Sequence, residues 1–185
     1  MEIGDTIYSI INAIGREKIQ SDITSDRGLS RDYIKTIIDQ CVKIIGATDA
    51  ETMGSLSEAL LHFMLTVSTL PSTRKVKLNN IDLDIVIPNL HSLRNSPDKA
   101  LIIQISKGNN HLVEGRLSNL TSIQPNYRNL WIVSSKPLTL ACINYTIDSE
   151  KKAMPPAKKR NFNDIIMDIG KFLEETGDRS LRFFQ

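Results

Sequence analysis

The chain has 185 residues, which is enough for one ordinary domain with a substantial core. Its composition, 41% hydrophobic and 24% charged, is typical of a soluble globular protein, and a net charge of +2 is too small to identify a nucleic-acid-binding protein. No apolar run approaches the roughly 18 residues that span a bilayer. Glu2 and Asp5 lie where a secretory signal carries basic residues, so we expect a cytoplasmic protein.

Cysteine and histidine do not form a metal-ligand pattern. Cys41 and Cys142 are far apart, and the three histidines form no ligand pair. A structural zinc site is therefore not expected, and Cys41 is interpreted as a small buried side chain on a helix. The sequence also has no Gly-rich phosphate loop and no nucleophile-elbow motif, which gives little support to a small-molecule enzyme.

The N-terminal part predicts two helices separated by a polar turn. Isoleucines at helical spacing predict a helix over Asp5–Ile14. Residues 20–28 are polar and typical of a turn. Ser30 is predicted to cap a strongly amphipathic helix that ends at Gly46.

A third helix is predicted from Ser55 to the residues before Pro71. Ser55 and Glu58 have the Ser-x-x-Glu spacing of a capping box. The helix is apolar on more than one side, so we expect it to be well buried.

The chain then changes to strand patterns. The turn Asn79–Asn80 predicts a hairpin between the first two strands, and Pro88 ends the second. A helix over 109–123 separates the third strand from the fourth. Residues 149–160 are predicted to be an exposed basic loop, followed by a last helix capped by Asn161 or Asn163. The expected strands are 74–78, 81–87, 100–106, 129–135 and 138–147.

This element order predicts an α/β fold with a mixed central sheet of about five strands and helices packed on it. We expect residues 1–50 to form a helical extension on a core of residues 51–185. The long apolar N-terminal helices favour a partner surface, and a homodimer is one interpretation.

Polar residues interrupt two of the apolar strands. Asp82 and Asp84 share one strand face, Gln104 lies inside the third strand, and Lys107 closes it. An aspartate in an apolar strand is disfavoured and is unstable if buried without partners. Carboxylates and a lysine on neighbouring strands are the components of a magnesium-assisted phosphodiester site.

The order helix, three strands, helix, strand over roughly Ser55 to Ser135 resembles the core of the PD-(D/E)XK nuclease-like superfamily, which includes restriction endonucleases and archaeal Holliday junction resolvases. In that family a helix supplies a glutamate and the second strand an aspartate, which Glu58 and Asp84 match. The third strand supplies an acidic residue and, two positions later, a lysine. The resemblance therefore implies a restriction endonuclease-like core.

The third-strand motif departs from the family pattern. If Lys107 is the lysine, Ile105 stands at the acidic position. If Gln104 is a neutral substitute for the acid, Ser106 stands at the lysine position. Gln104 and Lys107 point to opposite faces of a regular strand, so only a bulge, which Gly108 would permit, brings them together.

The resemblance implies a metal-dependent DNA phosphodiesterase with Asp84, Gln104, Lys107 and Glu58 as catalytic residues. Asp84, Glu58 and Gln104 would bind magnesium or manganese, and Lys107 would stabilise the charge developing on the phosphate. The alternative is a nuclease-like domain without catalysis that binds nucleic acid or assembles with proteins. Glu58 could also be a helix-capping residue only, and Lys107 a solvated strand end.

Local cations indicate where nucleic acid would bind, although 21 acidic residues leave open a set of ordinary solvated faces. Aromatic residues are only 5%, so a stacking platform for single strands is not expected. Phe183 and Phe184 could contact a protein partner or dock on their own domain. The predicted phosphate contacts are Lys75, Lys77, Lys107, Arg116, Arg128, Lys158, Lys159 and Arg160.

Overall fold

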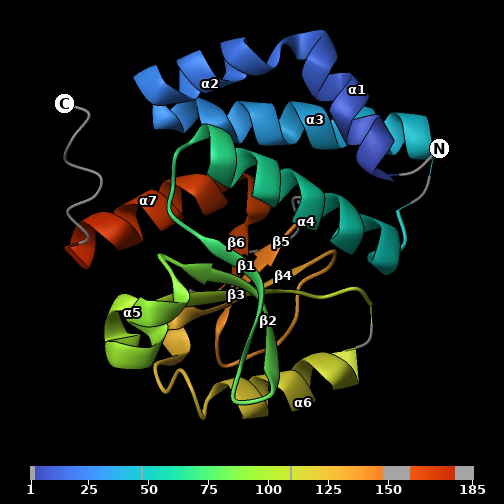
Figure 1. The fold of residues 1–185 in the computed structure, drawn as a ribbon. Helices are drawn as coiled ribbons and strands as arrows, with labels where there is room; N and C mark the ends of the chain where they lie inside the picture. The colour runs from blue at the N-terminus through green and yellow to red at the C-terminus, as the bar shows by residue number, and fades with distance from the viewer. Residues whose placement is uncertain (1–2, 47, 109, 148–158, 178–185) are drawn as a thin grey trace.

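In the computed structural model a mixed sheet, with six strands among the described residues, has helices on both of its faces (Figure 1). The structure describes residues 3–46, 48–108, 110–147 and 159–177. Helices α4 and α7 cover one face of the sheet, with α1–α3 packed on their outer side, and α5 and α6 cover the other face. The helices are α1 Ile3–Ile14, α2 Arg16–Ser25, α3 Ser30–Ile45, α4 Ala50–Val67, α5 Leu90–Asn95, α6 Asn110–Leu120 and α7 Ile165–Glu175.

The strands follow one another across the sheet in chain order. The first three are antiparallel, and β3 to β6 are parallel, with α6 as the crossover from β3 to β4. Asn79 and Asn80 have φ angles of 49° and 62°, the left-handed pair that a tight hairpin turn requires. The strands are β1 Thr73–Leu78, β2 Ile81–Ile87, β3 Leu101–Ile105, β4 Leu130–Ser134, β5 Ile143–Thr146 and β6 Lys159–Asn161.

Each face of the sheet has its own apolar core. In β3, Ile103 and Ile105 pack toward α4, whereas Ile102 packs toward α5 and α6. This alternation follows from the two-residue period of a strand. The larger core joins α1–α4, α7 and the sheet in one continuous cluster. The predicted α/β class with a mixed sheet is therefore confirmed, with a sixth strand, β6, in addition.

Three local predictions about the helices are wrong. Residues 16–25, expected to be partly a polar turn, form α2, which buries Ile19 and Ile23 one turn apart. Ser30 does not cap α3: Asp26 caps the short turn before it, so the chain is already helical at Ser30.

The predicted capping box of Ser55 and Glu58 is also wrong. Helix α4 begins earlier, at Ala50, and the Asp49 side chain accepts a hydrogen bond from the Thr52 N–H at 2.9 Å. Glu58 therefore lies in the middle of α4, where a capping role is impossible.

Part of the C-terminal segment for which predictions were made lies outside the described residues. The basic loop expected over 149–160 ends in a strand, β6, and most of its residues lie outside the described ranges. The same holds for Phe183, Phe184 and Lys158. Asn161 caps the short turn that leads into α7. In the described ranges no helix has the length and apolarity that crossing a bilayer requires.

Candidate active site

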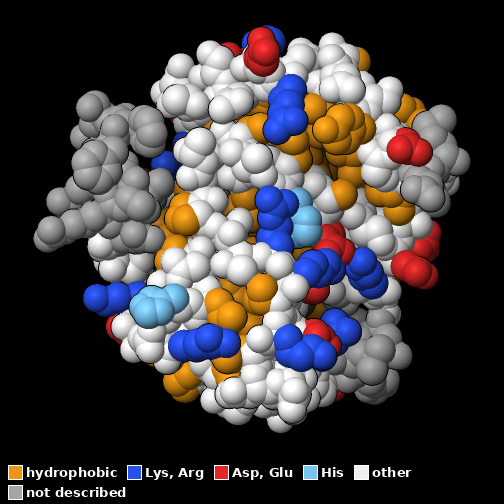
Figure 2. Space-filling model, viewed as in Figure 1, with side chains coloured by type: hydrophobic (Ala, Val, Ile, Leu, Met, Phe, Trp, Pro, Cys, Tyr) orange, Lys and Arg blue, Asp and Glu red, His pale blue; other side chains and the backbone are white. Residues whose placement is uncertain are grey.

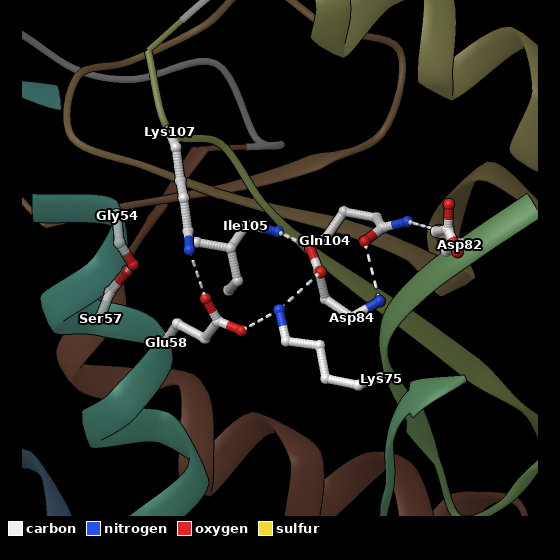
Figure 3. A network of polar contacts seen from close by, with 9 residues as sticks. All are labelled: Gly54, Ser57, Glu58, Lys75, Asp82, Asp84, Gln104, Ile105 and Lys107. Carbon is white, nitrogen blue, oxygen red and sulfur yellow. Dashed lines mark hydrogen bonds and ion pairs between the residues drawn. The ribbon is translucent and has the colours of Figure 1, made fainter. Parts of the chain in front are cut away.

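Strands β2 and β3 separate at Asp84, and side chains fill the gap between them. Backbone pairing covers Ile85–Ile87 and stops there. Beyond it, Asp84 Oδ2 accepts a hydrogen bond from the Ile105 N–H at 2.9 Å, and Gln104 Oε1 accepts one from the Asp84 N–H at 3.0 Å. Gln104 Nε2 donates to the Asp82 carbonyl at 2.9 Å. These bonds replace those of a regular ladder and fix the Asp84 carboxylate at the fork (Figure 3).

Helix α4 brings Glu58 to the same place. Its approach depends on Gly54, one turn before Glu58, because a Cβ at Gly54 would lie 2.7 Å from the Ser106 carbonyl oxygen. The chain after β3 therefore contacts α4 directly. Lys107 then reaches Glu58, and its Nζ lies 2.7 Å from Glu58 Oε2. Glu58 is only 8% exposed, so this ion pair lies at the base of the site.

Lys107 and Gln104 contact different partners, as expected for two side chains that point to opposite faces of a regular strand. Strand β3 ends at Ile105, and the Ser106 N–H still donates to the Val133 carbonyl. The Gln104 amide contacts the backbone of β2, whereas Lys107 contacts Glu58. The structure thus brings all four predicted catalytic residues to one region, and among the described residues no hydrogen bond joins Gln104 directly to Lys107.

Lys75 of β1 connects the two carboxylates. Its Nζ contacts Glu58 Oε1 and lies 3.4 Å from Asp84 Oδ1 (Figure 3). The sequence predicted Lys75 only as a phosphate contact. A signal for this pairing was present, since a two-residue turn at 79–80 places Leu78 opposite Ile81 and hence Lys75 opposite Asp84. No sequence signal indicated the role of Gly54.

The ion pairs set the protonation state of Glu58. Burial by itself raises the pKa of this carboxyl, but the contacts with Lys107 and Lys75 outweigh burial and hold the pKa below its usual value. Burial lowers the pKa of the Lys75 ammonium, and Glu58 and Asp84 more than restore it, so the pKa lies above its usual value. At neutral pH Glu58 is therefore a charged carboxylate in contact with the charged Lys75 ammonium.

A hollow of about 260 Å³ opens beside this cluster. Figure 2 shows basic and acidic side chains gathered near the middle of the face that carries the β1–β2 hairpin. Arg116 of α6 is exposed and reaches the hollow from the opposite helical layer. A phosphate in the hollow would meet several cations and one carboxylate. The polar lining consists of Lys75, Asp84, Gln104, Ser106, Lys107 and Arg116.

The other predicted phosphate contacts lie elsewhere. Lys77 pairs with the exposed Asp82 at 3.3 Å. Arg128 precedes β4, at the opposite end of the parallel strands, and lines a separate hollow of about 1410 Å³ together with Arg160. Arg160 pairs with Asp168 at 2.9 Å. Lys159 lies in β6.

His62 lies one turn after Glu58, and its buried Nε2 has no hydrogen-bond partner among the residues that the structure describes. Burial, reinforced by the nearby Arg74 charge, lowers the pKa of this imidazole. It is therefore neutral at pH 7.

The oxygen donors of the site are those that a magnesium ion prefers. In the described ranges no three or more histidine, cysteine, aspartate or glutamate side chains gather as a metal site. Two carboxylates do converge, because Glu58 Oε1 and Asp84 Oδ1 both face the Lys75 ammonium. Magnesium commonly takes one or two protein carboxylates and completes its octahedron with water and substrate phosphate. Glu58 and Asp84 fit such an ion, and the Lys75 ammonium lies between the same two carboxylates.

Comparison with known proteins identifies the fold. No protein-family model and no curated protein matches the chain. Among solved structures, a complex of the restriction endonuclease PspGI with substrate DNA has a TM-score of 0.66 at 15% identity, over 95% of this chain and 94% of that one. Metal-depleted Ecl18kI with uncleaved DNA has a TM-score of 0.58 at 11% identity, over 96% of this chain and 81% of that one.

The chain therefore has the restriction endonuclease-like, PD-(D/E)XK fold, as the sequence predicts.

Proposed function

We propose that this protein is a metal-dependent DNA phosphodiesterase. The observation that supports the proposal most is the convergence of Glu58, Asp84 and Lys107 from three separate elements beside an open, cation-lined hollow. The fold adds support, since its structural neighbours are restriction endonucleases solved with DNA.

In this proposal, Asp84 and Glu58 bind magnesium or manganese. A bound divalent ion would polarise the scissile phosphate and make a water molecule more acidic. Lys107 holds Glu58 ionised and is close enough to the hollow to stabilise charge on the phosphate. Gln104 positions Asp84 through the backbone of β2. If Gln104 is also a ligand, as the sequence predicts, it would use the Oε1 lone pair that does not accept from Asp84.

Lys75, Lys107 and Arg116 would bind the DNA backbone around the scissile phosphate. All three line the hollow, and their side chains come from both sides of the fork. Contacts of this kind are sequence-independent and weaken as salt rises. Lys77, Arg128, Lys158, Lys159 and Arg160 would be peripheral contacts on a longer duplex.

The test is cleavage of branched, double-stranded and single-stranded DNA with magnesium or manganese. We expect Asp84→Asn to lower the cleavage rate by about 100-fold or more, because even supporting residues of metal sites often contribute 10–100-fold. Asp82→Asn is the matched control, two residues away on the same strand but exposed and paired with Lys77. Absence of cleavage on every substrate with either ion would refute the proposal.

A second candidate is a nuclease-like domain that binds DNA without cutting it. It is favoured by one observation, that a lysine already lies between the two carboxylates. This function predicts DNA binding that a chelator does not change. Metal-dependent turnover that Asp84→Asn abolishes would exclude it.

A further inference from the structure

Each of the two carboxylates, Glu58 and Asp84, is bonded through one oxygen and faces the Lys75 ammonium with the other. Glu58 Oε2 is held by Lys107 at 2.7 Å, and Asp84 Oδ2 by the Ile105 N–H at 2.9 Å. Their other oxygens, Glu58 Oε1 and Asp84 Oδ1, both face Lys75 Nζ (Figure 3). The ammonium thus lies where an ion bridging the two carboxylates would lie.

The backbone directs Lys75 to this position. Lys75 lies directly across the hairpin from Asp84, and it is the one position between Thr73 and Leu78 at which the β1–β2 pairing is interrupted. Its φ angle is 50°, in the left-handed region that residues other than glycine and asparagine rarely adopt. Functional sites are where such conformations concentrate.

Lys77, two residues further along β1, gives the contrast. It pairs with Asp82, whose side chain is 82% exposed, and takes no part in the cluster. The Lys75 side chain is itself 57% exposed, although the carboxylates beneath it are only 10% and 18% exposed. The ammonium therefore has a direct route into solvent or toward a bound phosphate.

We propose that Lys75 is a built-in counter-ion, which occupies the divalent-cation position between Glu58 and Asp84 and leaves it when a divalent ion binds. This inference rests on the proposed function, because it takes the same two carboxylates as the metal ligands. An ammonium in contact with both oxygens and a divalent ion cannot share them, since magnesium–oxygen distances of about 2.0–2.1 Å would place two positive centres together. Lys75 therefore competes with the metal and lowers its affinity.

The same competition links the metal to DNA. A phosphate in the hollow attracts the Lys75 ammonium, since Lys75 lines it. Removing Lys75 from the carboxylates leaves Glu58 and Asp84 available to the divalent ion. By linkage, DNA and metal then each raise the affinity of the other.

The test is binding of Mn²⁺ alone, without DNA, to the full chain by titration calorimetry or by the paramagnetic signal of free Mn²⁺. We expect Lys75→Met to lower the Kd for Mn²⁺ at least tenfold relative to the unsubstituted protein, and Lys77→Met to leave it unchanged. The double variant K75M/D84N should lose the gain. If Lys75→Met binds Mn²⁺ with a Kd within twofold of the unsubstituted protein, or more weakly, or not at all, the inference is overturned.

Two further variants keep the test decisive. Thermal unfolding checks that Lys75→Met is folded, and Lys75→Gln replaces it if it is not. Lys75→Arg keeps the charge and should bind Mn²⁺ as weakly as the unsubstituted protein. DNA cleavage is measured separately, so a protein that never cuts DNA but gains Mn²⁺ affinity in Lys75→Met would refute the proposed nuclease and still support the counter-ion. A protein that cuts DNA but whose Lys75→Met variant gains no Mn²⁺ affinity would support the proposed nuclease and refute the counter-ion.

Discussion

Asp84 shows how an apolar strand accommodates an acidic residue. Both of its carboxylate oxygens have partners, a backbone N–H on one side and an ammonium on the other. Its own N–H is bonded by Gln104, which also satisfies the Asp82 carbonyl. Gln104 is thus explained by the fork between β2 and β3, since an apolar side chain there would leave two backbone groups without a bond. The polar residues that interrupt these strands form one connected arrangement.

Glu58 should make the stability of the protein depend on pH. Its pKa in the folded state lies below the usual value of 4.5. Between the folded-state pKa and pH 4.5, the unfolded chain therefore binds more protons than the folded chain. The stabilisation is therefore fully present above pH 4.5 and is lost as the pH falls through the folded-state pKa. We expect Glu58→Gln to lower the free energy of unfolding by about 1.5–3 kcal/mol at pH 7, a loss typical of hydrogen bonds to charged groups.

Chemical denaturation between pH 7 and pH 3.5 measures this effect. The difference between Glu58→Gln and the unsubstituted protein should shrink as the pH falls below 4.5. A difference that stays constant over this range would mean that the Glu58 ion pairs do not stabilise the fold.

Helix α4 and the end of β3 lie close together because Gly54 has no side chain. A Cβ added there would come within 2.7 Å of the Ser106 carbonyl oxygen and 2.9 Å of Lys107 Cγ. We expect Gly54→Ala to lower the free energy of unfolding by about 1–3 kcal/mol, the usual effect of overpacking. The added methyl group also displaces Lys107 from Glu58, so DNA cleavage should fall.

The control for this change is Gly115→Ala in α6, where an added Cβ would meet nothing within 4 Å. Without a clash, alanine should stabilise that helix by about 0.5–1 kcal/mol. Denaturant unfolding of both variants separates the two cases. Equal effects at positions 54 and 115 would mean that the close approach of α4 to β3 is not required.

The elements that the sequence predicted well are those with a strong periodic pattern. The hairpin followed from Asn79–Asn80, and the buried strand β3 from its run of isoleucines. Helix α2 was missed because only Ile19 and Ile23 mark its buried side. The start of α4 was misplaced because the Ser-x-x-Glu match at Ser55 was taken as the cap, whereas the helix is capped by Asp49, six residues earlier. A local sequence match alone does not fix where a helix begins.

The candidate site was predicted as a set of residues but not as a set of contacts. Glu58, Asp84, Gln104 and Lys107 do lie in one region. Which partner each one takes depends on the fork between β2 and β3 and on the approach of α4. Both are tertiary features. Lys75 was predicted only as a phosphate contact, although the register of the hairpin places it opposite Asp84.

The helical and sheet layers share one core. Side chains of α1 and α3 pack in the same cluster as α4 and the strands, where Ile34, Leu60 and Ile103 are each 0% exposed. Helices α1 and α3, which belong to the segment predicted to be an extension packed on the core, therefore lie against apolar surface that would face water without them. A separate extension would instead have a core of its own.

This continuity predicts a single cooperative unfolding transition. Trp131 fluorescence reports on the sheet, since this residue lies in β4 with its ring centre 5.0 Å from that of Tyr145. Far-UV circular dichroism reports mainly on the helices, of which α1–α4 are a large part. We expect the two signals to give coincident transitions in urea, because loss of α1–α3 exposes the apolar side of α4 that supports the sheet.

Ile34→Ala should shift both transitions together by about 2–5 kcal/mol, since it opens a cavity in the shared cluster. If the circular dichroism signal fell at lower urea than the fluorescence, and Ile34→Ala moved the first signal alone, residues 1–50 would be an independently folding unit, and the site at the fork would not depend on them.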